Sequence, residues 1–344
     1  MKRRDKILIA VSIVGIFLLI VGYYFFLVRP AKKVVKVGIM QIVDHPALNA
    51  VRDGFIEAMA ENGYLEGKNI AYDIQNAQGD IATANTIAQK FVSEKVDIIL
   101  SIATPTSQAA VNATTTIPIV FSAVTDPVGA GLVKNLKSSG NNVTGISDLT
   151  PVRRQFQLIK EIVPQAKRVG TLYNAAEINS VTTNNLAKEA CEELGLELLE
   201  ATVSSSADVF LAAQSLAGRV DAIYVSTDNT TVSALDAVVQ VTNENDIPLI
   251  IADPTTVEKG ALAALGFNYY QHGRQTTPIV IKILKGKKPT EIPVEFAKNL
   301  ELHINMDIVR EIGISPSSFR DSVSSFAKKI EEEGGQVETI VVGE

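Results

Sequence analysis

Cysteine and histidine are scarce in this sequence of 344 residues. The single cysteine, Cys191, excludes an internal disulfide framework and a metal site built from several thiolates. The three histidines, His45, His272 and His303, are scattered along the chain, so their spacing indicates no metal site. We therefore expect neither a metal ion nor a cofactor.

Motifs of the common nucleotide-binding and hydrolytic enzymes are missing as well. The sequence has no GxGxxG after its first expected strand, and no GxxxxGK[ST], GxSxG or HExxH. A carboxylate pair for acid–base catalysis could still come from Asp126, Asp228 and Asp253, although the sequence gives no distance between them. We expect a binding protein and not an enzyme.

Positive charge is concentrated at the N-terminal end. Of the 32 basic residues, eight precede Val37, and only one acidic residue lies among them. The remainder carries 24 basic and 37 acidic residues, a net charge of −13 with neutral histidines. An acidic body argues against a nucleic-acid partner. Length and ordinary apolar content predict a globular chain of two or three domains.

A run of 22 uncharged residues, Ile7 to Val28, follows the basic N-terminus. A helix of this length spans a hydrocarbon core of roughly 30 Å at about 1.5 Å per residue. The run is longer than the core of a cleaved signal peptide and ends in aromatic residues typical of the membrane interface. We expect residues 1–33 to be a signal anchor, a single transmembrane helix in the cytoplasmic membrane, with the binding domain outside the cytoplasm. A cleaved signal peptide is the alternative.

Apolar segments of strand length alternate with segments of helical periodicity along the body. The first pair is a strand over 34–42 and a helix over 47–62. Later strands, such as 96–100 and 117–121, are apolar on both faces, as in parallel sheets covered by helices on each side. The fold class is therefore predicted to be α/β.

The two halves of the body repeat a faint pattern. Four landmarks recur 124 to 132 residues later, in the pairs Gly38 and Gly170, Asp97 and Asp221, Pro118 and Pro248, and Asp126 and Asp253. This repeat predicts two similar Rossmann-like lobes. We expect lobe 1 over 34–148 with a returning helix over about 268–290, and lobe 2 over 149–267 with a C-terminal segment over about 291–330. Several crossings of the chain would form a hinge.

Polar residues follow most of the expected strands, where open parallel sheets bind their ligands. Each of them could instead only cap a helix or form a turn, for which the same residue types are preferred. One of Tyr269 and Tyr270, at the start of the returning helix, could also reach the cleft. The candidate ligand-binding residues are His45, Thr104, Thr106, Ser107, Thr125, Asp126, Tyr173, Asn174, Glu177, Asn179, Ser180, Thr227, Asp228, Asn229 and Asp253.

Two of these turns together suggest recognition of an amino acid. The turn over 104–107 combines hydroxyl groups with the free N–H groups of a helix N-terminus, which would hold a carboxylate. Asp228, after the equivalent strand of the second half, could accept hydrogen bonds from an ammonium group. It could instead cap the helix that begins near Thr230. The ring of Tyr173 could stack on a ligand or pack in the core.

Eight segments resemble a known family when taken together and in order. They are HPALNAVRDGF from His45, GKNIAYDIQNAQGD from Gly67, ATPTSQAA from Ala103, FSAVTDPVGAGLV from Phe121, YNAAEINS from Tyr173, VSTDNT from Val225, ADPTTVEKGALA from Ala252 and YYQHG from Tyr269. From about residue 35 to 319, the chain resembles the extracytoplasmic substrate-binding proteins of ABC transporters, in the group that includes the tryptophan-binding TrpX-type proteins.

The resemblance implies a type I periplasmic-binding-protein fold that closes on a small amino-acid-like ligand, such as an aromatic amino acid. Carried over by position, ligand contacts are expected at 104–107, 125–126, 174–180 and 227–229. Two features depart from the family: Ala175 and Ala176 stand where proline is common, and a lipid-attachment cysteine is missing. We expect a monomer that delivers its ligand to an ABC permease. A sensory binding protein or an enzyme on the same frame is the alternative.

Overall fold

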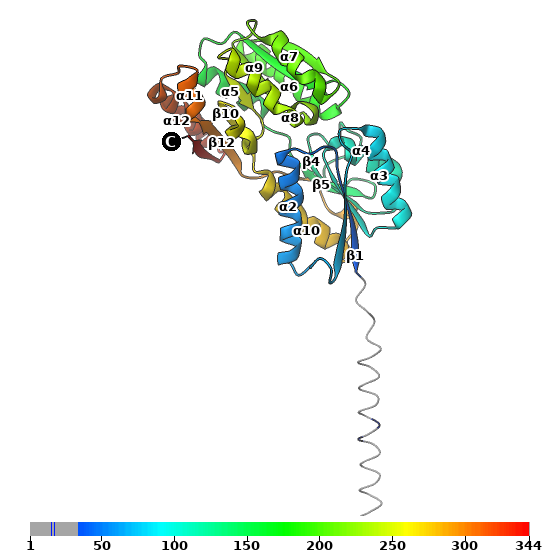
Figure 1. Ribbon diagram of the computed structural model, residues 1–344. Coiled ribbons are helices and arrows are strands. Elements are labelled where there is room, and N and C mark those ends of the chain that lie inside the picture. The colour runs from blue at the N-terminus through cyan, green and yellow to red at the C-terminus, as the bar shows by residue number, and fades with distance from the viewer. Residues whose placement is uncertain (1–14, 16, 18–33, 344) are drawn as a thin grey trace, which may run out of the picture.

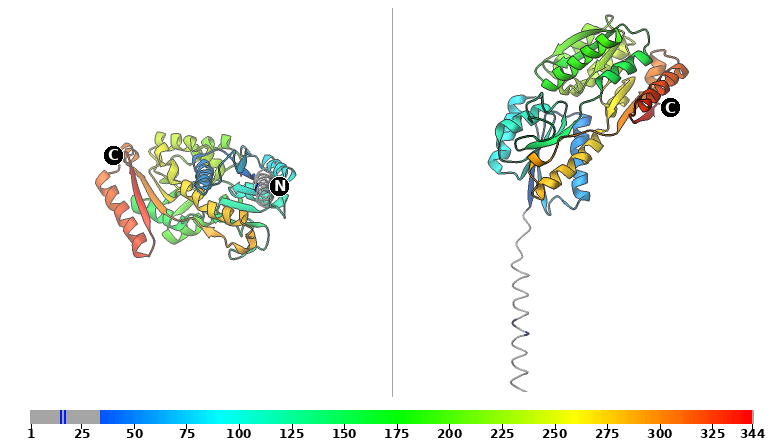
Figure 2. Two further views of the ribbon diagram at one scale, coloured as in Figure 1. Left: turned by 90° about the horizontal axis from the view of Figure 1, so that it is seen from below. Right: turned by 180° about the vertical axis from the view of Figure 1, so that it is seen from behind.

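The computed structural model describes residues 15, 17 and 34–343. Residues 34–343 form two α/β lobes, each built on its own sheet (Figure 1), and the view from behind in Figure 2 shows both lobes again. Apart from residues 15 and 17, the helix expected over 7–28 lies outside the described residues. None of the described helices combines the length and the apolar character that a membrane span requires.

The first sheet has six strands in the order β11-β5-β4-β3-β1-β2, and all neighbouring strands are parallel. Helices α2 and α10 pack together on one face, and α3 and α4 on the other (Figure 1). The bounds are β1 Val35–Gln41, α2 Pro46–Glu61, β2 Ile70–Asn76, α3 Ile81–Glu94, β3 Ile98–Ile102, α4 Thr104–Ala113, β4 Ile119–Val124, β5 Val143–Ser147, α10 Tyr269–Leu284, η3 Pro289–Glu291 and β11 Glu295–Phe296. Strands β3 and β4 are buried at every residue, as expected of strands covered on both faces.

The second sheet has seven strands in the order β13-β12-β10-β9-β8-β6-β7, and only its β10–β12 pair is antiparallel. Separate apolar cores lie on its two faces, one with α5, α6 and α12 and one with α7 and α9. The bounds are α5 Val152–Ile162, β6 Arg168–Asn174, α6 Ile178–Leu194, β7 Glu197–Val203, η1 Ser206–Asp208, α7 Val209–Leu216, β8 Ala222–Val225, α8 Asn229–Ser233, α9 Leu235–Glu244, β9 Leu249–Ile251, η2 Pro254–Lys259, β10 Ala263–Phe267, β12 Leu300–Asn305, α11 Met306–Glu311, α12 Pro316–Glu332 and β13 Val337–Val342.

The chain crosses between the lobes three times: from β5 to α5, from β10 to α10 and from β11 to β12. The returning segment stays with the first sheet longer than the expected division at about residue 290, because Ile292 and Val294 bury their side chains in the first core. Strand β11 then pairs with β5 before the chain crosses again. These three crossings connect the two described lobes, which is the arrangement that a hinge requires.

The landmarks of the internal repeat make equivalent contacts in the two lobes. Gly38 in β1 lies against Phe91 of α3, and Gly170 in β6 lies against Leu216 of α7, each so closely that a Cβ would collide with that side chain. Asp97 accepts a hydrogen bond from the backbone at the start of β1, and the equivalent Asp221 does the same at the start of β6. The two lobes therefore share the same close glycine packing and the same hydrogen bond at the start of the equivalent strand.

Helices α2 and α10 approach closely because glycines face backbone atoms at their contact. A Cβ on Gly54 would meet the carbonyl oxygen of Tyr270, and one on Gly273 would meet that of Val51. This contact fixes the position of the N-terminus of α10, which lies between the lobes.

Candidate functional site

A cavity lies between the two lobes, at the carboxyl ends of several strands. Its walls come from both sheets, since residues of the first lobe follow β1, β4 and β5, and those of the second follow β6, β8 and β9. The lining residues are His45, Ala47, Leu48, Ala123, Thr125, Asp148 and Tyr269 from the first lobe, and Asn179, Thr227, Asp228, Asn229, Val232 and Asp253 from the second. This is the position where open α/β sheets bind ligands.

Most of the side chains that line the cavity are buried. Asp148 and Asp253 are 3% and 4% exposed, and Thr125 and Asn179 are 3% exposed each. These four side chains are therefore almost fully shielded from solvent in this arrangement of the lobes.

Seven of the fifteen candidate residues line this cavity. They are His45, Thr125, Asn179, Thr227, Asp228, Asn229 and Asp253. Of the two tyrosines that begin α10, Tyr269 lines the cavity and is buried, whereas the Tyr270 hydroxyl donates to Glu57 on the surface.

The turn expected to hold a carboxylate, 104–107, does not line the cavity. The Thr106 hydroxyl donates to the carbonyl oxygens of Ile102 and Ala103, at 2.6 and 3.0 Å, and Ser107 hydrogen-bonds Ser101 at 2.8 Å. These two hydroxyls thus make their hydrogen bonds within the turn and the strand before it. The Thr104 hydroxyl is buried and has no partner in the described protein, so a ligand contact of this turn stays a prediction.

Two further candidates also lie away from the cavity lining. The Asp126 carboxylate accepts from the backbone N–H groups of Val128 and Gly129 and so closes a turn. Burial raises the pKa of Tyr173, and the neighbouring Glu200 carboxylate raises it further. A role of either residue in binding stays a prediction.

Asn174, Glu177 and Ser180 form a layer behind the cavity wall. The Glu177 carboxylate accepts hydrogen bonds from Asn229, Thr230 and Asn179. Burial and the charge of Asp228 both raise the pKa of Glu177. This layer connects the turn after β6 to the turn after β8, and so orients Asn179 and Asn229 toward the cavity.

Asp228 lines the cavity but also caps a helix. One carboxylate oxygen accepts from the Thr231 N–H and the other from the Asn174 N–H, each at 2.6 Å. The capping alternative is thus present in the structure, and both oxygens already have backbone donors. The sequence left open whether Asp228 caps the helix or accepts hydrogen bonds from an ammonium group. This geometry supports the cap and weakens the case for Asp228 as the main ammonium acceptor.

Two other aspartates each keep one oxygen without a partner. Oδ2 of Asp148 accepts from the Tyr269 hydroxyl at 2.9 Å, whereas its Oδ1 has no hydrogen bond within the described protein. Oδ1 of Asp253 accepts from the N–H and hydroxyl of Thr255, whereas its Oδ2 has none there. A buried polar atom without a partner costs about 1–3 kcal/mol, and a charged one more.

Burial also changes the protonation of these groups. It raises the pKa of Asp148 to about 6, and the hydrogen bonds from Tyr269 and Thr125 only partly oppose this change. Burial raises the pKa of Asp253 to about 6 as well, partly opposed by Thr255 and reinforced by the charge of Asp148. In the closed cavity the two carboxylates thus disfavour each other's ionisation.

Two buried histidines lie at the cavity: His45 lines it, and His272 lies behind the wall. Burial lowers the pKa of each to about 4, so both are neutral at pH 7. His45 has an unpartnered Nδ1 and lines the cavity. Nε2 of His272 accepts from the N–H of Ala123, a residue with φ of 54° at an irregularity of β4. His272 therefore holds the strand in the conformation that directs Ala123 at the cavity.

Besides Tyr269, which the sequence offered as one of two tyrosines, five lining residues are not among the candidates: Ala47, Leu48, Ala123, Asp148 and Val232. Asp148 directly follows β5, so the rule that ligands bind after parallel strands could have found it. The apolar residues give no such signal, because Leu48 and Val232 have the same helical spacing as core residues.

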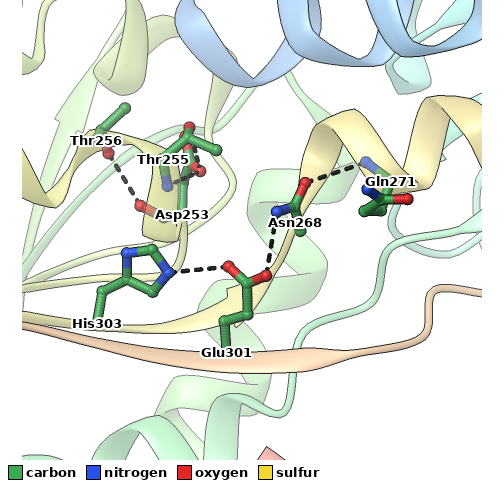
Figure 3. A network of polar contacts seen from close by, with 7 residues as sticks. All are labelled: Asp253, Thr255, Thr256, Asn268, Gln271, Glu301 and His303. Carbon is green, nitrogen blue, oxygen red and sulfur yellow. Dashed lines mark hydrogen bonds and ion pairs between the residues drawn. The ribbon is translucent and has the colours of Figure 1, made fainter. Parts of the chain in front are cut away.

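A polar network lies at the hinge beside Asp253 (Figure 3). Glu301 of β12 accepts from the Asn268 side chain at 3.1 Å and contacts His303 at 2.8 Å. Asn268 in turn caps α10 by accepting from the Gln271 N–H. The network ties the start of α10, and hence Tyr269, to the second sheet.

Comparison with known proteins identifies the family. Residues 36–330 match the family model described as ABC transporter substrate binding protein. The chain belongs to this family of substrate-binding proteins. The type I periplasmic-binding-protein fold implied by the sequence segments is thereby confirmed.

Several relatives show what this substrate-binding protein is similar to. The "Tyrosine-binding protein" of Clostridioides difficile is 42% identical over 288 residues, 84% of each chain. The ABC domain from Streptococcus pneumonia, solved in complex with L-Trp, is 33% identical with a TM-score of 0.80, covering 89% of this chain and all of that one. A ligand-free, open substrate-binding protein from Clostridium difficile is 40% identical with a TM-score of 0.64, covering 90% of this chain and all of that one.

We infer a closed arrangement of the lobes, because residues of both line one largely buried cavity. The structure superposes better on the relative that holds L-Trp than on the ligand-free, open relative, although the open one is more similar in sequence. The low exposure of the cavity walls agrees with this comparison.

Proposed function

We propose that this substrate-binding protein captures a free aromatic amino acid, tyrosine or tryptophan, between its lobes and presents it to an ABC permease. The observation that carries the proposal is the cavity, where buried polar atoms without partners lie beside an apolar wall. Thr227 and His45 offer neutral donors, Asp148 and Asp253 offer acceptors, and Leu48 is apolar. These are the groups that an amino acid with a large apolar side chain requires.

Binding and closure are coupled in this proposal. A ligand that touches both lobes stabilises the closed arrangement by the difference in its affinity for the closed and open forms. The three crossings of the chain allow this rigid-body motion. The permease would then recognise the closed, loaded protein.

The N-terminal segment belongs to the same proposal. An uncleaved apolar helix over residues 7–28 would keep the binding domain outside the cytoplasm and beside its permease. Two lobes, divided after residue 148 and joined again by the segment after 267, would perform the capture.

A fluorescence titration tests the function directly. The chain contains no tryptophan, so the indole emission in a mixture of protein and L-Trp comes from the ligand alone. We expect the emission of L-Trp to shift to shorter wavelength on binding, and L-Tyr to compete for the site. Leucine and lysine serve as control ligands. If neither aromatic amino acid binds, the proposed function is wrong.

A further inference from the structure

The charges that line the cavity are of one sign. Three aspartates, Asp148, Asp228 and Asp253, are among the thirteen lining residues, and none of these thirteen described residues is lysine or arginine. A ligand with a positive group is therefore favoured, whereas a ligand's carboxylate finds no side-chain cation in the wall.

The hydrogen bonds distinguish the three carboxylates. Both oxygens of Asp228 accept from backbone N–H groups. Asp148 and Asp253 each keep one oxygen that is buried and unpartnered. A primary ammonium group has three N–H donors, enough for both free oxygens at once.

The two carboxylates come from opposite lobes. Asp148 follows β5 of the first sheet, and Asp253 precedes η2 and follows β9 of the second. They lie close enough for the charge of Asp148 to act on Asp253. When the lobes close without a cation, the two carboxylates repel each other. A cation bound between them would replace this repulsion with attraction.

We propose that Asp148 and Asp253 form a single ammonium site across the two lobes, and that the ammonium group of the ligand contributes more to binding than its carboxylate does. This inference rests on the proposed function and specifies how that site selects its ligands. The carboxylate is left to neutral donors such as the Thr227 hydroxyl and His45, whose hydrogen bonds are weaker than those between two charged groups.

Three ligands that differ by one group test the order of these contributions. L-Tyr, tyramine, which lacks the carboxylate, and 3-(4-hydroxyphenyl)propionate, which lacks the ammonium group, are measured by calorimetry on the full-length protein in detergent. We expect the propionate to bind at least a hundredfold more weakly than L-Tyr, and tyramine to bind more tightly than the propionate. A propionate that binds as tightly as tyramine overturns the proposal.

Variants locate the site on the two aspartates. Asp148→Asn and Asp253→Asn keep the size of the side chain, and Asp321→Asn, on the exposed face of α12, is the matched control. We expect each cavity variant to bind L-Tyr at least tenfold more weakly and to lose most of its preference for L-Tyr over the propionate. Circular dichroism checks that the variants are folded. Folded variants that keep the wild-type preference overturn the proposal.

The outcomes separate this inference from the function on which it rests. Binding of L-Tyr with no dependence on the ammonium group leaves the function intact and refutes the site. If no aromatic amino acid binds, the proposed function is wrong, but tyramine still tests the ammonium site. Tyramine binding that is lost in both cavity variants supports the site. If tyramine does not bind, the site is refuted.

Discussion

Acidification is expected to close the ligand-free protein. Burial in the cavity between the lobes raises the pKa of Asp148 and of Asp253 from an ordinary value of 3.8 to about 6, and opening would remove the part of this burial that the opposite lobe contributes. When a carboxyl group has a higher pKa in the closed form than in the open form, its protonation shifts the equilibrium toward the closed form. Closure therefore becomes more favourable as the pH falls from 6 to 4. About two pKa units correspond to about 3 kcal/mol for each carboxylate.

His45 opposes this effect. Its pKa falls from 6.5 to about 4 on burial, so protonation below pH 6.5 favours the open form, where the ring is hydrated. A change of this size corresponds to about 3 kcal/mol. The groups that face these three are Tyr269 and Lys259, together with the carboxylate of Asp228. At pH 4 the aspartates of an open form would still be partly ionised and the buried His45 is half protonated, so two aspartates against one histidine leave at most about 2 kcal/mol in favour of closure, roughly thirtyfold in the ratio of closed to open protein.

Small-angle X-ray scattering measures the closure. We expect the radius of gyration of the ligand-free protein to be larger at pH 7.5 than at pH 4, a change in the same direction as the one that a saturating ligand produces at pH 7.5. In the double variant Asp148→Asn/Asp253→Asn, His45 is the one of these three groups that still titrates, so acid should open that protein. A wild-type radius of gyration that stays constant or increases on acidification would refute the reasoning.

Three other predictions concern stability and binding. L-Trp at roughly one hundred times its Kd should stabilise the protein by about 2.7 kcal/mol, seen as a higher melting temperature, and an unchanged value would count against the ligand. Tyr269→Phe removes the hydroxyl that donates to Asp148 and should weaken L-Tyr binding by about 1.5–3 kcal/mol in calorimetry, whereas equal affinity would exclude this hydrogen bond from the site. Gly273→Ala places a Cβ against the backbone of Val51 and should destabilise the protein by about 1–3 kcal/mol in chemical denaturation, and an unchanged midpoint would show that α2 and α10 can separate without cost.

Much of the candidate site follows from one sequence rule. Polar residues after parallel strands were expected to face the cleft, and Thr125, Thr227 and Asp253 do line it. The rule fails where a polar side chain is used locally, as for Thr106, which donates to carbonyl oxygens within its own turn. Spacing alone cannot separate the two uses, because capping and ligand binding employ the same residue types.

The sequence by itself determined the α/β class, the two lobes and the family, because apolar periodicity, the repeated landmarks around Gly38 and Gly170 and the family's segments are local patterns that can be read without the fold. Only the tertiary structure decided which carboxylates remain free for a ligand. The Asn174 N–H that donates to Asp228 lies 54 residues away from it, and the Tyr269 hydroxyl that donates to Asp148 lies 121 residues away. A carboxylate's remaining capacity to bind depends on donors that folding brings from a distance, and no short segment of sequence contains them.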